Sequence, residues 1–489
     1  MLHVSDLVHA EKCEAYAWNC AHRKLPFQSY YHMDVPFSAL WKQYLGYQTY
    51  GEGHVGQTNS DTLSLLKKYD VVYQARFEYR GLRTKIPVLI RKDQGWLALY
   101  PHLSAYPKEE EARFMKLNDQ AAASIGVTIC DHEILYLNKD YVRQDELDLS
   151  QCFLRSKQLF NHRNHLNKTI QECIDETELD LDEWIDKTKP ILEGERPEIK
   201  RTKACTSGRR CVYYSYCFDE SKEPDDSVLF LTTSQYKLDA YEKGIRHIKD
   251  MPIDQLEGFR LQYSQYMASR NGGQFADRNA IQSWLSHIQY PISYLDFEWD
   301  TFAIPPYRGM RPFDVLCFQY SLHIEEKDKP LRHEDFFESG DCREAFVKSL
   351  IEKIPASGTI LVYNMEGAEK LRLTQLAEQF PQYAEKLKTI CGRMVDLSKP
   401  FEAGLLYDNR MRGHYSLKSI LPVFSDQYSY QELPVSDGMD AVQAYREFAN
   451  ADPEKQTKIR EAIRTYCSLD TLAEYIVYHG LLDLNKEEN

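Results

Sequence analysis

The sequence predicts an α/β protein that folds as more than one domain. The chain has 489 residues, whereas a single domain usually has about 100–200 residues. Strand-like and helix-like segments alternate in the first part of the chain and again in its last part, and this alternation is typical of α/β domains. We therefore expect two α/β domains, over residues 1–225 and 290–489, separated by a helical connector over residues 226–289.

The centre of the first domain is expected to form strands, because β-branched and aromatic residues dominate four segments there. These segments are VVYQARFEY (71–79), KIPVLIRK (85–92), GWLALY (95–100) and HEILYLN (132–138). A helix is expected before the fourth strand, from Lys108 to Ile125. Residues 139–200 have a mostly helical, acidic pattern, and we interpret the acidic residues of its clearest helix, 176–190, as a solvated face.

The connector is expected to contain two helices, over residues 236–248 and 256–267. The second domain then begins with strands and continues with long helices. Its expected strands are ISYLDFEWD (292–300), RPFDVLCFQYSLHI (311–324) and GTILVYN (358–364). Strands followed by helices suit an α/β domain with a central mixed sheet.

The composition is that of an ordinary soluble protein, with 43% hydrophobic and 27% charged residues. The N-terminal residues lack a basic region followed by an apolar stretch, and nowhere do 18 apolar residues run together. We therefore expect a cytoplasmic protein without a membrane partner. The net charge of −14 argues against a protein that coats nucleic acid by bulk charge, and leaves room for a local basic groove.

The twelve cysteines are expected to be reduced thiols, because cytoplasmic thiols rarely form disulfides. Cys205, Cys211 and Cys217 are separated by five residues each, and Cys13 lies far upstream. Four such thiolates can hold a [4Fe–4S] cluster or a tetrahedral zinc ion. The alternative is that three reduced cysteines cluster by chance, because buried free cysteine is common. The other eight cysteines show no such grouping, and we interpret them as ordinary core or surface thiols.

Two carboxylates predict a metal site in the second domain. Asp296 and Glu298 are two residues apart in a strand, so they point to the same face of the sheet. Mg²⁺ and Mn²⁺ prefer such hard oxygen ligands, and two ions about 3.5–4 Å apart can promote phosphodiester cleavage.

Further candidate ligands lie in two later segments. LVYNMEGAEKLRL (361–373) offers Asn364, Glu366 and Glu369, and TYCSLDTLAEY (465–475) offers Tyr466 and Asp470 on one helix face. Taken singly, each acid is more simply a surface carboxylate or a helix cap.

The order of these residues resembles that of the DEDD family of 3′–5′ exonucleases, which have a ribonuclease-H-like fold. The resemblance covers about residues 290–485 and extends to the Tyr-x-x-x-Asp motif of one subclass. It implies that Asp296 and Glu298 are the first metal-binding pair and that Asp470 is the last metal ligand. It also implies that Tyr466 orients the attacking water.

The remaining acid of that family is usually an aspartate that follows an aromatic residue. By register we assign Glu369 to this position, and its longer side chain implies weaker activity or a different metal preference. Two weaker candidates are Asp396, in an auxiliary role, and Lys418, as a phosphate contact.

The chain as a whole resembles a bacterial family that joins a RecB-like iron–sulfur nuclease domain to a DEDD-like domain. The resemblance is carried by LDFEWDTFAIPPYRGMRPFDVLCFQYSLH (295–323), LVYNMEGAEKLRL, HYSLKSILP and YCSLDT. It implies that Cys13, Cys205, Cys211 and Cys217 hold one metal cluster, iron–sulfur in preference to zinc.

RecB-like nucleases of the PD-(D/E)XK type need an Asp and a Glu-x-Lys motif on neighbouring strands. The corresponding positions are Pro87, Tyr100 and His102, and none of them supplies a carboxylate. Gln120 corresponds to a helical glutamine of that family. The resemblance therefore implies a degenerate nuclease domain that is retained for nucleic-acid binding.

Basic and aromatic residues around the late cysteines fit a nucleic-acid contact surface. They are Lys200, Arg201, Lys203, Arg209, Arg210, Tyr213 and Tyr214. The alternative is an exposed basic loop that packs on the preceding acidic helix.

Together these features predict a metal-dependent 3′–5′ exonuclease that hydrolyses DNA, in preference to RNA, at free ends or in single strands. Two Mg²⁺ or Mn²⁺ ions would be bound by Asp296, Glu298, Glu369 and Asp470. The alternative is a catalytically weak or inactive nucleic-acid-binding subunit that carries a metal cluster.

Overall fold

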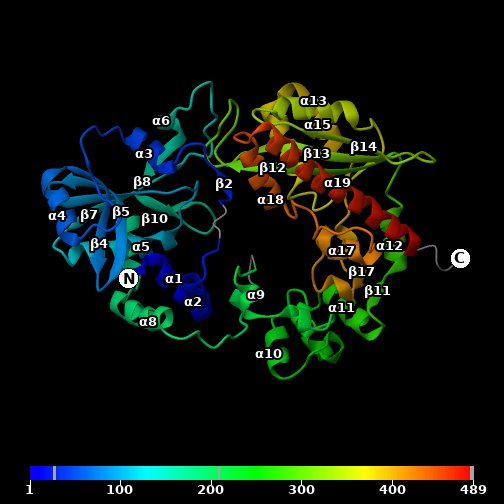
Figure 1. The fold of residues 1–489 in the computed structure, drawn as a ribbon, viewed down its shortest axis with the longest axis horizontal. Coiled ribbons are helices and arrows are strands. Elements are labelled where there is room, and N and C mark those ends of the chain that lie inside the picture. Colours follow the sequence, from blue (N-terminus) through cyan, green and yellow to red (C-terminus); the bar gives the residue numbers. More distant parts are fainter. Residues whose placement is uncertain (26–28, 207–209, 485–489) are drawn as a thin grey trace. The chain divides into compact units, whose positions relative to one another are not determined.

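The computed structural model describes residues 1–25, 29–206 and 210–484 of a mixed α/β protein (Figure 1). The chain forms two compact units. The first contains residues 1–218 and 302–313, and the second contains residues 219–301 and 314–489. In the described part of the chain, no helix is long and apolar enough to cross a membrane.

The first unit is built on a seven-stranded sheet with the order β3-β4-β5-β6-β7-β8, in which β1 pairs with β5. The strands are β1 (Leu2–His3), β3 (Gly51–Glu52), β4 (Val71–Tyr79), β5 (Leu82–Lys92), β6 (Gly95–Pro101), β7 (Ile129–Leu137) and β8 (Phe153–Ser156). The four predicted central strands are thus confirmed. The predicted helix after β6 is confirmed as α5 (Ala112–Ala123), whose Ala121 and Ala122 pack in one core cluster with Phe77 and Ile86.

The β4–β5 hairpin has a two-residue turn that fixes the register of its strands. Tyr79 pairs with Leu82, and the two residues between them, Arg80 and Gly81, have φ angles of 48° and 82°. Two central residues with positive φ are typical of the turn type that matches the twist of an antiparallel hairpin.

The prediction that residues 139–200 are mostly helical is partly wrong. The segment contains α6 (Leu149–Cys152), α7 (Ile170–Glu176) and α8 (Leu181–Glu193), but also β8 and the strands β9 (Gln158–Phe160) and β10 (Leu166–Thr169). These strands have three or four residues each, which is too short to produce a recognisable alternation of apolar and polar side chains.

The second unit contains the sheet order β14-β13-β12-β15-β16. Its strands are β12 (Ile292–Phe302), β13 (Val315–Glu325), β14 (Arg332–Phe337), β15 (Thr359–Val362) and β16 (Met394–Asp396). β12, β13 and β14 pair antiparallel, whereas β15 and β16 continue the sheet parallel to β12. The three predicted strands are confirmed, and β14, a polar edge strand, was not predicted.

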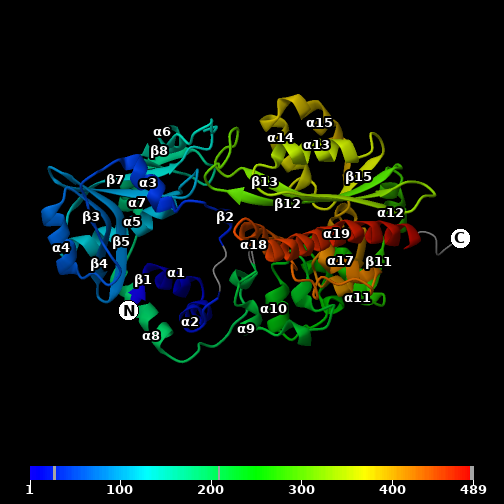
Figure 2. The same cartoon turned by 45° about the horizontal axis from the view of Figure 1, so that its top comes forward.

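Helices cover both faces of this sheet (Figure 2). On one face lie α13 (Arg343–Lys353), α14 (Glu369–Gln379) and α15 (Ala384–Cys391), which share a core cluster with Leu295 and Phe297 of β12. On the other face lies the 32-residue helix α19 (Pro453–Leu484). Because β12 alternates its side chains between the faces, Asp296 and Glu298 point toward α19.

Residues 219–291 belong to the same compact unit as this sheet. They contain α10 (Lys237–Glu242), α11 (Arg260–Arg270), β11 (Gln274–Ala276) and α12 (Arg278–Leu285). The first predicted connector helix, over residues 236–248, is therefore shorter than expected. It stops before Gly244, whose φ of 91° is incompatible with a continued helix.

Candidate metal centre

The candidate centre lies between β12 and α19. The carboxylates of Asp296 and Glu298 on β12 face Tyr466, Asp470 and Glu474, which are spaced four residues apart on α19 and therefore share one helix face. Glu298 and the three α19 side chains are buried, whereas Asp296 is partly exposed.

A thiol completes a compact set of possible ligand atoms. One ligand atom each of Asp296, Glu298 and Cys467 lies within 4.8 Å of the other two, which is the only such trio or larger group among the described residues. The buried Cys467 Sγ donates a hydrogen bond to Asp296 Oδ2 at 3.1 Å. We had predicted no role for Cys467, because it lies outside the spaced cysteine motif.

The third predicted carboxylate, Glu369, joins this cluster from the start of α14. It is 1% exposed, and the backbone of Phe297 on β12 acts to lower its pKa. Burial nevertheless raises the pKa of Glu369 to about 8. Glu369 therefore retains a proton at neutral pH unless a cation replaces that proton.

The other carboxylates of the cluster are perturbed in the same direction. Burial is the main cause: it raises the pKa of Asp470 to about 6 and the pKa of Glu298 well above its ordinary range. The pKa of Asp296 is also well above its ordinary range, because burial is reinforced by the charges of Asp470, Glu298 and Glu369. Such a concentration of like charge in a desolvated site favours bound cations.

Glu474 is a fifth carboxylate that the sequence interpretation did not include. It is 1% exposed, and burial together with the charge of Asp296 raises its pKa well above its ordinary range. Its Oε2, like the Oε2 of Glu369, is buried without a hydrogen-bond partner among the described residues. The spacing from Asp470 to Glu474 is one helical turn, which is the signal that could have identified it.

Two tyrosines and a lysine surround Asp470. The Tyr430 hydroxyl donates a hydrogen bond to Asp470 Oδ1 at 2.7 Å. Lys418 Nζ lies 5.3 Å from the ring centre of Tyr430 and 5.2 Å from that of Tyr466, and it donates to the Ser436 carbonyl oxygen at 2.6 Å. The positive charge of Lys418 lowers the pKa of Asp470 and of Glu298, which partly offsets the effect of burial.

A third acid on the same face of β12 is already neutralised. Asp300 is fully buried, and its Oδ1 lies 2.6 Å from Nη2 of Arg446 on α18 (Gly438–Phe448). Because Arg446 balances the charge of Asp300, this residue does not belong to the carboxylates that lack a counter-charge. Glu298 is therefore the last member of the acidic cluster on β12.

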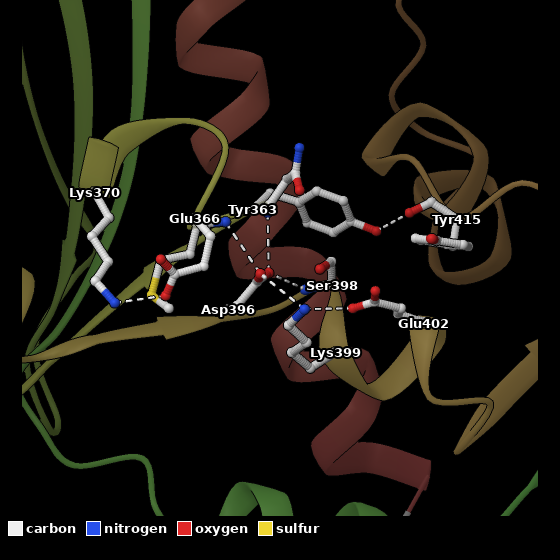
Figure 3. Close-up of polar contacts among 10 residues, drawn as sticks. Tyr363, Glu366, Lys370, Asp396, Ser398, Lys399, Glu402 and Tyr415 are labelled. Carbon is white, nitrogen blue, oxygen red and sulfur yellow. Dashed lines mark hydrogen bonds and ion pairs between the residues drawn. The ribbon is translucent and has the colours of Figure 1, made fainter. Parts of the chain in front are cut away.

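Asp396 organises the turn that precedes Glu369 (Figure 3). Its carboxylate accepts hydrogen bonds from the backbone N–H groups of Asn364 at 3.0 Å, Met365 at 3.1 Å and Ser398 at 2.9 Å. Asn364 has a φ of 64°, in the left-handed region that asparagine adopts more readily than most residues other than glycine, and these bonds hold it there. Asp396 thus caps the turn structurally, and an auxiliary role in the metal centre stays a prediction.

Glu366, another polar residue of this segment, does not enter the acidic cluster. It is exposed at the surface and pairs with Lys370 at 2.6 Å (Figure 3). Of the acids in LVYNMEGAEKLRL, only Glu369 lies among the buried carboxylates.

The four predicted cluster cysteines all belong to the first unit and are partly buried. Burial raises the pKa of Cys217, and the nearby Cys211 and Cys13 contribute to this shift. The backbone N–H of Cys211 donates to the carbonyl oxygen of Cys205 at 3.0 Å. Their sulfurs do not form a group within 4.8 Å of one another, as judged from the described residues, so the shared cluster stays a prediction.

The positions that the resemblance assigns to a PD-(D/E)XK site make ordinary contacts within the first unit. The Tyr100 hydroxyl accepts a hydrogen bond from Asn118 on α5 at 3.3 Å, and burial raises the pKa of Tyr100. His102 Nε2 lies 3.2 Å from Glu111 Oε1. Pro87 lies on β5 and Gln120 on α5.

The expected nucleic-acid contact surface is only partly accessible. Three of its cations, Lys200, Lys203 and Arg210, are exposed. Tyr213 and Tyr214 are buried, so their rings are not accessible for the stacking on bases that the sequence predicts. Arg210 lies over the Tyr214 ring at 4.2 Å and Arg201 over Phe218 at 4.3 Å. Arg209 lies outside the described residues.

Comparison with known proteins adds one family match. A family described as a domain of unknown function (DUF2779) matches residues 293–416, which include Asp296, Glu298 and Glu369. No curated protein matches the chain, and no solved structure matches it. Residues 293–416 of the chain are thus similar to the DUF2779 domain.

Proposed function

We propose that this protein is a divalent-metal-dependent phosphodiesterase, and specifically a 3′–5′ exonuclease that acts on DNA at free ends or in single strands. The observation that carries the proposal is the cluster of Asp296, Glu298, Glu369, Asp470 and Glu474 between β12 and α19. Five carboxylates lie together there, and two of their buried oxygens have no partner. Divalent cations would satisfy those oxygens and compensate the charge.

The sheet supports the ribonuclease-H-like part of the proposal. Three antiparallel strands extended by two parallel ones, in the order β14-β13-β12-β15-β16, are compatible with such a fold. The first strand of this sheet, β12, is central and carries the first two acids. The later acids come from the start of α14 and from α19, as the resemblance to DEDD exonucleases implies.

The donor set suits Mg²⁺ or Mn²⁺, because it consists mainly of carboxylate oxygens. We assign the binding of these ions to Asp296, Glu298, Glu369 and Asp470. Two such ions, when bound, would activate water and stabilise the leaving oxygen of a phosphodiester. Cys467 and Glu474 are additional donors at the edge of this set.

Tyr466 would position the attacking water. Burial raises its pKa, so the phenol keeps its proton at neutral pH and acts as a hydrogen-bond donor or acceptor, not as an anionic base. Tyr430 holds Asp470 through the 2.7 Å hydrogen bond and so fixes the orientation of one expected ligand. Lys418 supplies positive charge near the position where a phosphate would approach.

For the first unit we propose a role in holding the strand. Its PD-(D/E)XK positions lack carboxylates, and its exposed Lys200, Lys203 and Arg210 can contact phosphates. We also propose that Cys13, Cys205, Cys211 and Cys217 bind a [4Fe–4S] cluster, or zinc as the alternative, in a cytoplasmic protein. Binding of a single zinc ion would require three or more of these sulfurs to lie closer together than they do in the described residues.

The second candidate function is a nucleic-acid-binding subunit with little or no activity. The observation that favours it is Glu369, which replaces the usual aspartate and whose pKa of about 8 opposes the ionised form. In this case the cluster would bind metal without productive cleavage.

The test is degradation of end-labelled single-stranded DNA and RNA in Mg²⁺ or Mn²⁺ by anaerobically purified protein. We expect digestion of DNA from the 3′ end, loss of digestion in Glu369→Gln, and retention in Glu366→Gln, the matched change on the exposed side of the same turn. Loss is also expected in the Asp296→Ala, Asp470→Ala double variant. If the wild type binds DNA but does not cleave it, the binding-subunit function replaces the exonuclease proposal.

A further inference from the structure

A second polar site lies in the first unit, in a pocket at the β4–β5 hairpin. The pocket has a volume of about 370 Å³. Its walls come from the start of α1 (Val4–Lys12), from β4 and β5, and from α5. Three of the lining residues are the cations Arg76, Arg83 and Lys85.

Two of these cations face each other across the hairpin. Arg76 on β4 is the direct cross-strand partner of Lys85 on β5, and the register places Glu78 opposite Arg83. Directly opposite residues of an antiparallel pair lie on the same face with their Cβ atoms about 4.5–5.5 Å apart, so a like-charged pair destabilises the sheet. The two-residue turn at Arg80 and Gly81 fixes this register, and the repulsion is therefore built into the hairpin.

The positive charge of this pocket is poorly compensated. Within the described part of the chain, the Arg76 side chain has neither a hydrogen bond nor an ion pair, and its Nε is buried without a partner. Lys85 Nζ donates to the neutral amide oxygen of Gln74 at 2.9 Å. Its pKa is lowered, first by burial and then by the charge of Arg76.

Two carboxylates lie near the pocket but do not neutralise it. Glu78 Oε2 is 3.7 Å from Nε of Arg83, which is longer than a hydrogen bond, and this Nε is also buried without a partner. Asp6 is occupied at the start of α1, where its carboxylate accepts the backbone N–H of His3 at 2.8 Å. Even if Glu78 compensates Arg83, the positive charges of Arg76 and Lys85 have no carboxylate partner among the described residues.

The neighbouring elements add neutral and dipolar donors. β1 pairs parallel to β5 with His3 opposite Arg83, which places the N-terminal end of the nine-residue helix α1 beside the guanidinium groups. The positive end of a helix dipole favours an anion. Asn118 of α5 completes the wall with a side-chain amide.

We propose that this pocket binds a phosphate group. A guanidinium presents paired N–H donors that match phosphate oxygens, and an ammonium adds a point charge, so the side chains of Arg76, Arg83 and Lys85 provide a suitable donor set. The phosphate can belong to a nucleic-acid strand or to a small phosphorylated compound, since both present the same chemistry. This assignment depends on the first unit alone and holds whether or not the metal centre cleaves phosphodiesters.

The first test measures the thermal unfolding midpoint of the full-length protein with increasing inorganic phosphate, at constant ionic strength set with chloride. Because a ligand that binds only the native state stabilises it, we expect phosphate to raise the midpoint of the wild type. Arg76→Gln should weaken the phosphate affinity about tenfold or more, as expected for loss of a charge-assisted contact. Lys92→Gln, the same kind of change at an exposed position of β5, should leave the affinity unchanged.

Arg76→Gln also removes a repulsive pair, so its midpoint without phosphate should equal or exceed that of the wild type. If this variant does not fold, Lys85→Gln provides the same comparison. A wild-type midpoint that does not respond to phosphate, or a response that persists in both variants, would overturn the proposal.

The source of the phosphate is decided by fluorescence anisotropy with a labelled single-stranded oligonucleotide. If a strand occupies the pocket, inorganic phosphate will compete with the oligonucleotide more strongly than chloride does at equal ionic strength, and Arg76→Gln will weaken oligonucleotide binding. If oligonucleotide binding is unchanged in Arg76→Gln while the phosphate response is lost, the pocket serves small phosphorylated compounds.

Discussion

Replacing Glu474 by glutamine should stabilise the metal-free protein and reduce the stabilisation that bound metal adds. Glu474 is buried, and its Oε2 has no hydrogen-bond partner. Its nearest charges are those of Asp296, Glu369 and Asp470, all of the same sign. Without metal, glutamine removes a carboxyl group whose ionised form these charges oppose, and it offers two N–H donors to the surrounding carboxylates. With metal, it removes an anionic donor.

The magnitude follows from the environment of the side chain. A buried polar group without a partner costs about 1–3 kcal/mol, and more if it is charged. We therefore expect Glu474→Gln to raise the free energy of unfolding of the metal-free protein by about 2 kcal/mol at pH 8. For a unit of this size, that gain corresponds to a rise of about 4–8 °C in the unfolding midpoint.

The assay is differential scanning calorimetry in EDTA and again in saturating Mn²⁺. In EDTA the variant should unfold at a higher temperature than the wild type. Mn²⁺ should raise the unfolding midpoint of the variant less than that of the wild type, because its affinity for the ion is reduced about tenfold. Glu366→Gln is the matched control, because Glu366 forms an exposed ion pair with Lys370 that contributes at most about 1 kcal/mol. The reasoning would be refuted if Glu474→Gln destabilised the metal-free protein, or if Mn²⁺ stabilised the variant as much as the wild type.

Three further outcomes test other parts of the centre. Tyr430→Phe removes the 2.7 Å hydrogen bond to Asp470, so the affinity for Mn²⁺ should fall about tenfold in a calorimetric titration, while an unchanged affinity would show that Tyr430 does not support this ligand. Cys467→Ser should weaken binding of Co²⁺ or Zn²⁺ more than binding of Mg²⁺, because sulfur is a soft ligand. The near-ultraviolet sulfur-to-cobalt band should be weaker in Cys467→Ser than in the wild type, and equal bands in the two proteins would exclude the Cys467 thiol as a ligand. For Glu369, whose native pKa of about 8 exceeds the ordinary 4.5, the native state holds a proton between these values that the unfolded chain releases. The free energy of unfolding in EDTA should therefore fall as the pH rises toward 8, and saturating Mn²⁺ should remove this dependence; urea unfolding at pH 6, 7 and 8 checks both statements.

The sequence predicted the long, regular strands and the acids that lie within them. The strands over residues 71–100 and 292–302 have enough alternating apolar residues to identify them, and the two-residue spacing of Asp296 and Glu298 determines their common face. The strands β8, β9, β10 and β14 were missed because they are short or polar, and their pairing depends on neighbours elsewhere in the chain.

The remaining residues of the candidate centre are brought together by contacts between segments that lie far apart in the chain. No local sequence pattern reveals such contacts. Tyr430 and Asp470 are 40 residues apart, and nothing in the segment around Tyr430 indicates its partner. Cys467 lies next to Tyr466 in the sequence, but its contact with Asp296 arises only when α19 packs on β12. Glu474 could have been found from helical spacing, yet an acid in an amphipathic helix is usually a surface residue, so its burial was not predictable.

The separation of β12 and α19 along the chain also has a consequence for the order of folding. Asp296 and Cys467, which are in contact in the native state, are 171 residues apart. Until α19 docks, the acidic face of β12 stays hydrated and its charges repel one another weakly across water. The docking of α19 therefore removes these charges from water, and this single step carries the energetic cost of their desolvation. Partial opening of that helix would rehydrate the carboxylates and release a bound ion while the rest of the sheet remains folded.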